Sequence, residues 1–174
     1  MNSKTDEIMK VFYTYPEKKF HIRELARITK VSPAGVRLIL KRLVKDGLLY
    51  SKNHGNMIEF EISRIEKYYT SKILNNINSL FGSGLVGFLR NVYDQPKAII
   101  LFGSYSDGTD TSESDIDIAI ITNKKNPKEW LSKYEKKLKR NINIIEVDLN
   151  KADKKFLNNL ANGFKLHGYV EWFK

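Results

Sequence analysis

The chain has 174 residues, of which 41% are hydrophobic and 11% aromatic, and it contains no cysteine. This composition excludes a disordered chain, and the lack of cysteine excludes a disulfide framework, a zinc knuckle and a thiol nucleophile. The formal net charge of +10 favours an anionic partner, because a basic surface attracts nucleic acids and nucleotides.

The charge is unevenly distributed along the chain. Residues 1–66 contain 13 basic and 8 acidic residues, whereas residues 98–174 contain 13 and 11. The first third is therefore the expected binding region for a polyanion.

Residues 1–7 lack the pattern of a secretory signal, and no apolar run approaches the roughly 18 residues of a membrane span. We expect a cytoplasmic protein without a membrane segment.

The first third of the chain is predicted to hold three helices and a hairpin. Ser32 and Pro33 provide the N-cap and the first residue of the third helix, and Gly47 ends it. Apolar periodicity places the helices at residues 6–15, 22–30 and 33–46, and the strands at 48–51 and 57–62 around a turn at 52–56. This order of elements is the layout of a winged helix.

The third helix has a basic face opposite its apolar stripe. A helix-turn-helix inserts such a helix into the major groove of DNA. With Ile22-Arg23-Glu24-Leu25-Ala26-Arg27 and Ser32-Pro33-x-x-Val36, residues 5–62 resemble the winged helix-turn-helix of archaeal and bacterial transcription regulators. The resemblance implies binding of double-stranded DNA, and a protein-docking role is the alternative. The candidate DNA-binding residues are Ser32, Arg37, Lys41, Lys45, Asn53 and His54.

The remainder of the chain changes from helices to strands. Residues 63–92 have helical periodicity, interrupted at Gly82-Ser83-Gly84. Strands are then expected at 98–102, 116–121 and 142–149, and helices at 129–140 and 151–161. The predicted fold class is α+β, with a mixed sheet and flanking helices. The predicted domains are a winged helix (1–64), a helical connector (65–96) and a C-terminal domain (97–174).

Two short motifs in the C-terminal domain carry chemical information. Gly103 and Ser104 follow a strand and permit a sharp turn whose N–H groups can meet a phosphate. Asp115 and Asp117 alternate with isoleucines, so both carboxylates lie on one face of a strand. Two like charges at this separation favour a divalent cation between them. Phosphoryl transfer uses such cations.

These motifs, ten residues apart, resemble the nucleotidyltransferase superfamily of DNA polymerase beta and kanamycin nucleotidyltransferase, and most of all the minimal nucleotidyltransferases. Asn162-Gly163-Phe164-Lys165-Leu166-His167-Gly168 resembles the family's Gly-x-x-Leu-Tyr-Gly, with His167 in place of Tyr. The resemblance implies Mg²⁺ or Mn²⁺ as cofactor and transfer of a nucleoside monophosphate from an NTP, taken as ATP, to a hydroxyl acceptor, which could be a protein. The implied nucleotide-binding residues are Gly103, Ser104 and Ser114, and the implied metal ligands include Asp115 and Asp117.

The resemblance also implies a third carboxylate on a neighbouring strand. Asp148 is the preferred catalytic and metal-binding candidate, because Val147-Asp148-Leu149 is similar to the family's Val-Asp-Leu. Glu146 is the alternative. If Asn143 aligns instead, the third acid is missing.

Asp107 differs from the family pattern, because many minimal nucleotidyltransferases carry Arg just before the glycine that corresponds to Gly108. One alternative is that Lys124 or Lys125 supplies the positive charge for the phosphates. The other is that the domain has lost its catalytic turnover. In the second case the protein is a DNA-binding regulator or an antitoxin-like protein that only binds nucleotide. Turn or cap roles are expected for Asp107 and Asp110. The three histidines, His21, His54 and His167, lack the spacing of metal ligands. Trp130 and Trp172 are expected to pack in the interior of the fold. A homodimer remains an option.

Overall fold

A computed structural model describes residues 4–55, 57–124 and 130–172. The chain divides into two compact units, Met1–Asn75 and Asn76–Lys174, called the N-terminal and C-terminal units below. The boundary falls within helix α4 (Glu66–Ser83), inside the stretch predicted as a connector. Within the described residues, no helix combines the length and the apolar character needed to cross a membrane.

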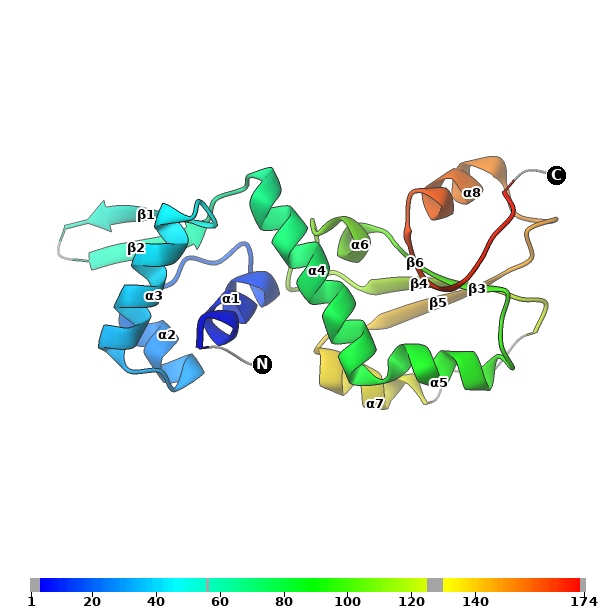
Figure 1. The fold of residues 1–174 in the computed structure, drawn as a ribbon, viewed down its shortest axis with the longest axis horizontal. Coiled ribbons are helices and arrows are strands. Elements are labelled where there is room, and N and C mark those ends of the chain that lie inside the picture. The colour runs from blue at the N-terminus through cyan, green and yellow to red at the C-terminus, as the bar shows by residue number, and fades with distance from the viewer. Residues whose placement is uncertain (1–3, 56, 125–129, 173–174) are drawn as a thin grey trace. The chain divides into compact units, whose positions relative to one another are not determined.

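The N-terminal unit consists of three helices followed by an antiparallel hairpin (Figure 1), in the predicted order. Ser32 caps the third helix, since its Oγ accepts the Gly35 N–H at 3.2 Å and Pro33 needs no donor at the first helical position. The elements are α1 (Lys4–Thr14), α2 (Ile22–Thr29), α3 (Pro33–Lys45), β1 (Leu49–His54) and β2 (Met57–Ile62).

Aromatic residues join the helices of this unit around one core. The rings of Phe12 and Phe20 meet edge to face at 5.2 Å, and the buried Tyr68 hydroxyl donates to the Phe12 carbonyl at 3.1 Å. Tyr15 and Ile28, apolar residues within the predicted helices 6–15 and 22–30, are 42% and 47% exposed. Tyr15 follows the last residue of α1, and Ile28 lies in the last turn of α2, so neither faces the core.

The C-terminal unit is built on a four-stranded mixed sheet with strand order β5-β4-β3-β6. Strands β4 and β5 are parallel, and the other neighbours are antiparallel. The strands are β3 (Ala98–Phe102), β4 (Ile116–Ile121), β5 (Ile142–Val147) and β6 (Phe164–Gly168). The mixed sheet was predicted, but β6 was not, because only Leu166 among its residues is buried and no apolar run marks it.

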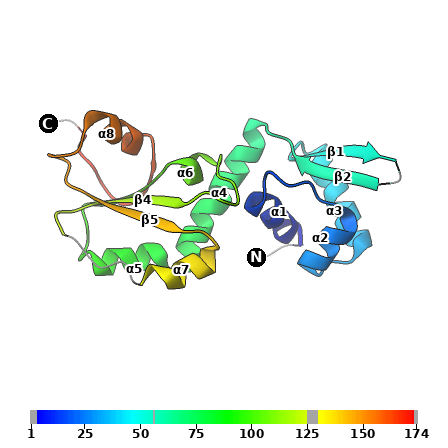
Figure 2. The ribbon, with the colours of Figure 1, turned by 180° about the vertical axis from the view of Figure 1, so that it is seen from behind.

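Helices cover both faces of this sheet. Figure 1 and Figure 2 show α8 (Lys154–Ala161) on one side and α5 (Leu85–Val92) with α7 (Leu131–Leu138) on the other. The α8 side is an apolar layer in which Trp172 packs as expected, and Trp130 packs on Phe88 with ring centroids 4.8 Å apart. A four-residue helix, α6 (Ser104–Asp107), follows β3 directly.

Gly168 provides a test of the pairing between β6 and β3. Its φ is +73°, and a Cβ at this position would lie 2.0 Å from the Lys97 carbonyl oxygen. We expect Gly168→Ala to lower the free energy of unfolding by about 2 kcal/mol in urea denaturation, because the left-handed backbone and the clash both oppose a side chain. Gly87→Ala in α5 is the control, since no atom lies within 4 Å of the added methyl group. Equal losses in both variants would contradict this account.

Candidate active site

The turn after β3 lies against the first residues of β4. The two strands pair with Phe102 opposite Asp117, so Gly103 comes next to the Asp117 side chain. Gly103 has φ 70° and ψ −165°, and a Cβ there would lie 2.7 Å from Asp117 Oδ2. This backbone conformation is essentially restricted to glycine, and the missing side chain leaves the space that the carboxylate occupies.

The loop between the turn and Asp115 is held by local hydrogen bonds. The Ser106 hydroxyl donates to the Gly103 carbonyl at 2.7 Å. Asp107 Oδ1 accepts the Thr109 N–H at 2.9 Å, which confirms its predicted turn role. Ser114 Oγ accepts the Thr111 N–H at 2.9 Å, so this predicted nucleotide-binding residue closes the turn that leads into Asp115.

Asp110 is buried, which the sequence did not predict. Its side chain is only 1% exposed and lies 3.9 Å from the Arg140 guanidinium, measured from Oδ2 to Nη2. The burial was not predicted because the Arg140 partner lies 30 residues away and no local pattern reveals it.

Two amides from the β5 side hold the two carboxylates of the predicted metal site. Asn141 Nδ2 donates to Asp115 Oδ1 at 3.1 Å, and Asn143 Nδ2 donates to Asp117 Oδ1 at 3.0 Å. Asp115 is exposed and Asp117 is half-buried. The amides orient the carboxylates without neutralising them, so the pair retains two negative charges.

The structure does not bring Asp148 together with Asp115 and Asp117. The parallel register pairs Asp117 with Asn143, and Asp148 comes after the end of β5, on the order of 16 Å farther along the strand. Hydrogen bonds from Asn150 and the ion pair with Lys151 lower the pKa of Asp148 in a surface turn. The prediction of Asp148 as third acid therefore disagrees with the register.

Glu146 does not take the position of the third acid either. It pairs with Ile120, and its carboxylate accepts the Tyr93 hydroxyl at 2.7 Å from the end of α5. Since successive residues of a strand point to opposite faces, Glu146 lies on the face away from Asp117. Asn143 is thus the residue opposite Asp117, which is the alternative in which the third acid is missing.

The positive charge expected near the phosphates is not supplied by Lys124. Its ammonium group pairs with Asp94 at 2.7 Å, beyond the end of β4 that is opposite to Asp117. The other candidate, Lys125, lies outside the described residues. In the described part of the chain, no three His, Cys, Asp or Glu side chains form a group that could hold a metal ion.

The DNA-binding candidates lie on the surface of the N-terminal unit. An open groove of about 1130 Å³ contains three arginines in its lining, Arg23, Arg27 and Arg37. The other lining residues are His21, Ile22, Glu24, Pro33, Ala34, Met57 and Ile58. Arg23 and Arg27 were not among the predicted DNA-binding residues, although both stand in the segment Ile22-Arg23-Glu24-Leu25-Ala26-Arg27. Lys41, Lys45, Asn53 and His54 are also exposed, and Ser32 serves as the helix cap described above.

Comparison with known protein families supports the expected superfamily for the second half of the chain. Residues 84–166 match the family model described as Polymerase beta, Nucleotidyltransferase. The matched segment contains the Gly103 turn, Asp115, Asp117 and Asn143. A comparison with curated proteins found no match. The family match supports a nucleotidyltransferase domain within the C-terminal unit, and with it a nucleotide substrate.

Proposed function

We propose that the C-terminal unit is a metal-dependent nucleotidyltransferase that acts on an NTP, with ATP as the first candidate, and a hydroxyl acceptor. The contact between Asp117 and Gly103 carries this proposal, because it places a carboxylate beside a turn of exposed backbone inside the matched segment. In the reaction, the acceptor oxygen bonds to the α-phosphorus while the bond to pyrophosphate breaks.

The residues present fit one divalent cation. Carboxylate oxygens are the hard ligands that Mg²⁺ and Mn²⁺ prefer, and two of them balance the charge of one such ion. Asp115 and Asp117 would hold it, and substrate phosphates and water would complete its coordination. When bound, the cation would neutralise phosphate charge and align the reacting groups.

The chain's own groups orient the substrate. The backbone N–H groups of Gly103 and Ser104 are the proposed phosphate donors. Asn141 and Asn143 keep the two carboxylates in place through the hydrogen bonds described above. Since neither amide can accept a proton at neutral pH, activation of the acceptor hydroxyl would rest on Asp115 or Asp117.

Asp117→Asn tests the metal site. We expect this variant to lose Mg²⁺-dependent ATP binding in calorimetry, and pyrophosphate release, by about 100-fold or more, because one charged ligand is replaced by a neutral one. Asp148→Asn provides the contrast, since Asp148 lies at the other end of β5. If Asp148→Asn lost more ATP binding and pyrophosphate release than Asp117→Asn, Asp148 would belong to the active site and the proposed arrangement would be refuted.

A second function, nucleotide binding without transfer, is favoured by one observation. The position opposite Asp117 is held by Asn143, which cannot serve as a base. Asp107 adds negative charge to the same loop instead of compensating a triphosphate. Under this alternative the protein is a DNA-binding regulator or an antitoxin-like protein, and the nucleotide is its ligand.

Asn143→Asp separates the two functions. Without metal, the new carboxylate should destabilise the unit by on the order of 1 kcal/mol, the Coulomb energy of two unit charges about 4 Å apart in water. With Mn²⁺, the variant should gain more thermal stability than the wild type. Under the binding-only alternative, it should also release more pyrophosphate. A variant whose melting temperature responds to Mn²⁺ as the wild type does would exclude position 143 from the metal site.

We also propose that the N-terminal unit is a winged helix that binds double-stranded DNA. Three exposed or partly exposed arginines line one groove beside α3, and Lys41 and Lys45 continue the basic face along that helix. Leu38 is 73% exposed on the same helix, where it could contact a thymine methyl group. The combination of three arginines in one groove and an exposed apolar side chain supports a duplex partner.

Arg37→Ala and Lys41→Ala test this partner. Each loss of a phosphate contact should flatten the dependence of log Kd on log salt concentration by about one unit, and loss of a base contact should cost roughly 1–3 kcal/mol at a preferred sequence. Fluorescence anisotropy with a labelled duplex measures both effects. Lys133→Ala in α7 is the control for net charge. Absence of duplex binding by the wild type at about 50 mM salt would favour the protein-docking role.

A further inference from the structure

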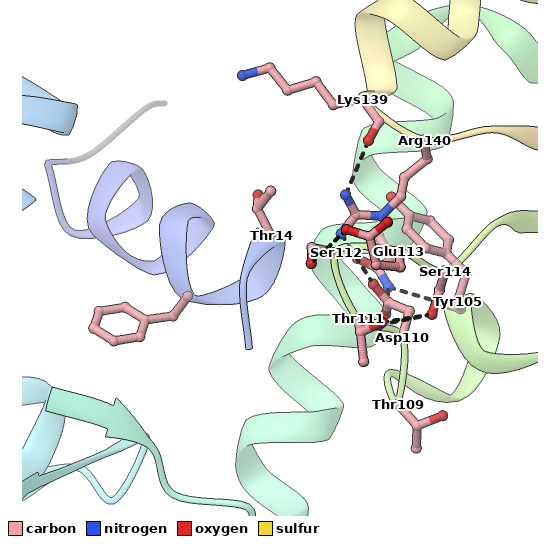
Figure 3. Close-up of polar contacts among 12 residues, drawn as sticks. Thr14, Tyr105, Thr109, Asp110, Thr111, Ser112, Glu113, Ser114, Lys139 and Arg140 are labelled. Atoms are coloured by element: carbon pink, nitrogen blue, oxygen red, sulfur yellow. Dashed lines mark hydrogen bonds and ion pairs between the residues drawn. The ribbon is translucent and has the colours of Figure 1, made fainter. Parts of the chain in front are cut away.

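A buried charged cluster lies next to the proposed nucleotide turn. Asp110 is 1% exposed and Arg140 is 7% exposed, and their side chains form an ion pair. Figure 3 shows Arg140 beside Tyr105 and the loop that contains Asp110 and Ser114. Burying two charges is costly, and such a pair often stabilises a fold no better than apolar residues would. The pair therefore calls for a role other than stability alone.

Asp110 is tied to the beginning of the loop. Its backbone N–H donates to the Ser104 carbonyl at 3.2 Å. Its carboxylate oxygen Oδ1 accepts Asn76 Nδ2 at 2.9 Å, and the same nitrogen donates to the Tyr105 carbonyl at 3.0 Å. One buried amide from α4 thus holds both Asp110 and the short helix that follows Gly103.

Arg140 is tied to the end of the loop. The next residue, Asn141, donates from its side chain to Asp115 at 3.1 Å, and its carbonyl accepts the Ile116 N–H at 2.9 Å. The Arg140 guanidinium also donates to the Lys139 carbonyl at 3.1 Å. The ion pair therefore connects the segment that holds Ser104 with the segment that holds Asp115.

We infer that Asp110, Arg140 and Asn76 are positioning residues for nucleotide binding, which set the separation between the Ser104 turn and Asp115. This inference rests on the proposed nucleotide site. A site that binds phosphates at the Ser104 turn and a cation at Asp115 needs the turn and the carboxylate at a fixed distance from each other. Contacts from outside the loop are required to fix that distance. Here α4 and the start of β5 provide that support.

The test compares Asp110→Asn, Arg140→Gln and the double variant in affinity for Mg²⁺–ATP, measured by calorimetry in conditions where urea denaturation shows each protein to be fully folded. Each single variant should weaken binding about tenfold or more. The double variant should be no weaker than either single one, because all three remove the same interaction. Arg140→Lys, which keeps the charge, should restore most of the affinity.

Tyr93→Phe is the matched control. It removes a hydrogen bond from a buried residue of the same unit, on the sheet face away from Asp117. It should reduce stability while leaving ATP affinity unchanged. If folded Asp110→Asn and Arg140→Gln bind ATP as the wild type does, the pair is only structural and the inference is overturned. If the wild type binds no ATP, the proposed nucleotide site fails, and the positioning role fails with it.

If the single charge variants do not fold, Asn76→Ser provides a milder change. It keeps the ion pair and removes the amide that holds Tyr105 and Asp110. The expected result is again weaker ATP binding by the folded protein. Relative to the wild type, amide hydrogen exchange in this variant should then become faster in residues 104–115 but not in β4. Wild-type affinity and exchange in this variant would also overturn the inference.

Discussion

The C-terminal site depends on the close approach of the Asp117 carboxylate to the α-carbon of Gly103. The antiparallel pairing of β3 and β4 brings the two residues side by side, and the positive φ of Gly103 turns the chain immediately afterwards. Any side chain at position 103 would have to displace the carboxylate or reshape the turn. The position of the Asp117 carboxylate and the conformation of the Gly103 turn therefore depend on each other. A change in the turn would also change the chemistry proposed for Asp117.

The second constraint is the register between β4 and β5. It gives Asp115 and Asp117 neutral amide partners, Asn141 and Asn143, in place of a third acid. Amide donors satisfy the hydrogen-bonding capacity of carboxylates but leave their charge intact. The pair therefore remains suited to the proposed cation, whereas proton removal from an acceptor would have to come from the two acids themselves. Cation binding is thus better supported by this arrangement than rapid transfer.

Sequence reasoning predicted some of these features better than others, for physical reasons. An unbroken apolar run marked β3, and the alternation of Asp115 and Asp117 with isoleucines marked β4 and correctly placed both acids on one face. Alternation within β4 does not determine the register of the neighbouring strand, however, so it cannot tell which polar residue of β5 lies opposite Asp117. The preference for Asp148 failed at this step. The burial of Asp110 was missed because it depends on Arg140, which is distant in sequence and brought close only by the fold.

The two proposed sites attract anions by different physics. In the N-terminal unit the exposed arginines lie in a groove, so binding would be driven by counterion release and would weaken with salt. In the C-terminal unit the proposed site holds two carboxylates, and the loop before them also carries the acidic Asp107 and Glu113. The Lys124 ammonium is paired with Asp94 elsewhere. A triphosphate would be repelled there unless a cation bridges it to Asp115 and Asp117. Divalent metal should therefore govern nucleotide binding but not duplex binding, so that one protein could respond to the two ligands independently.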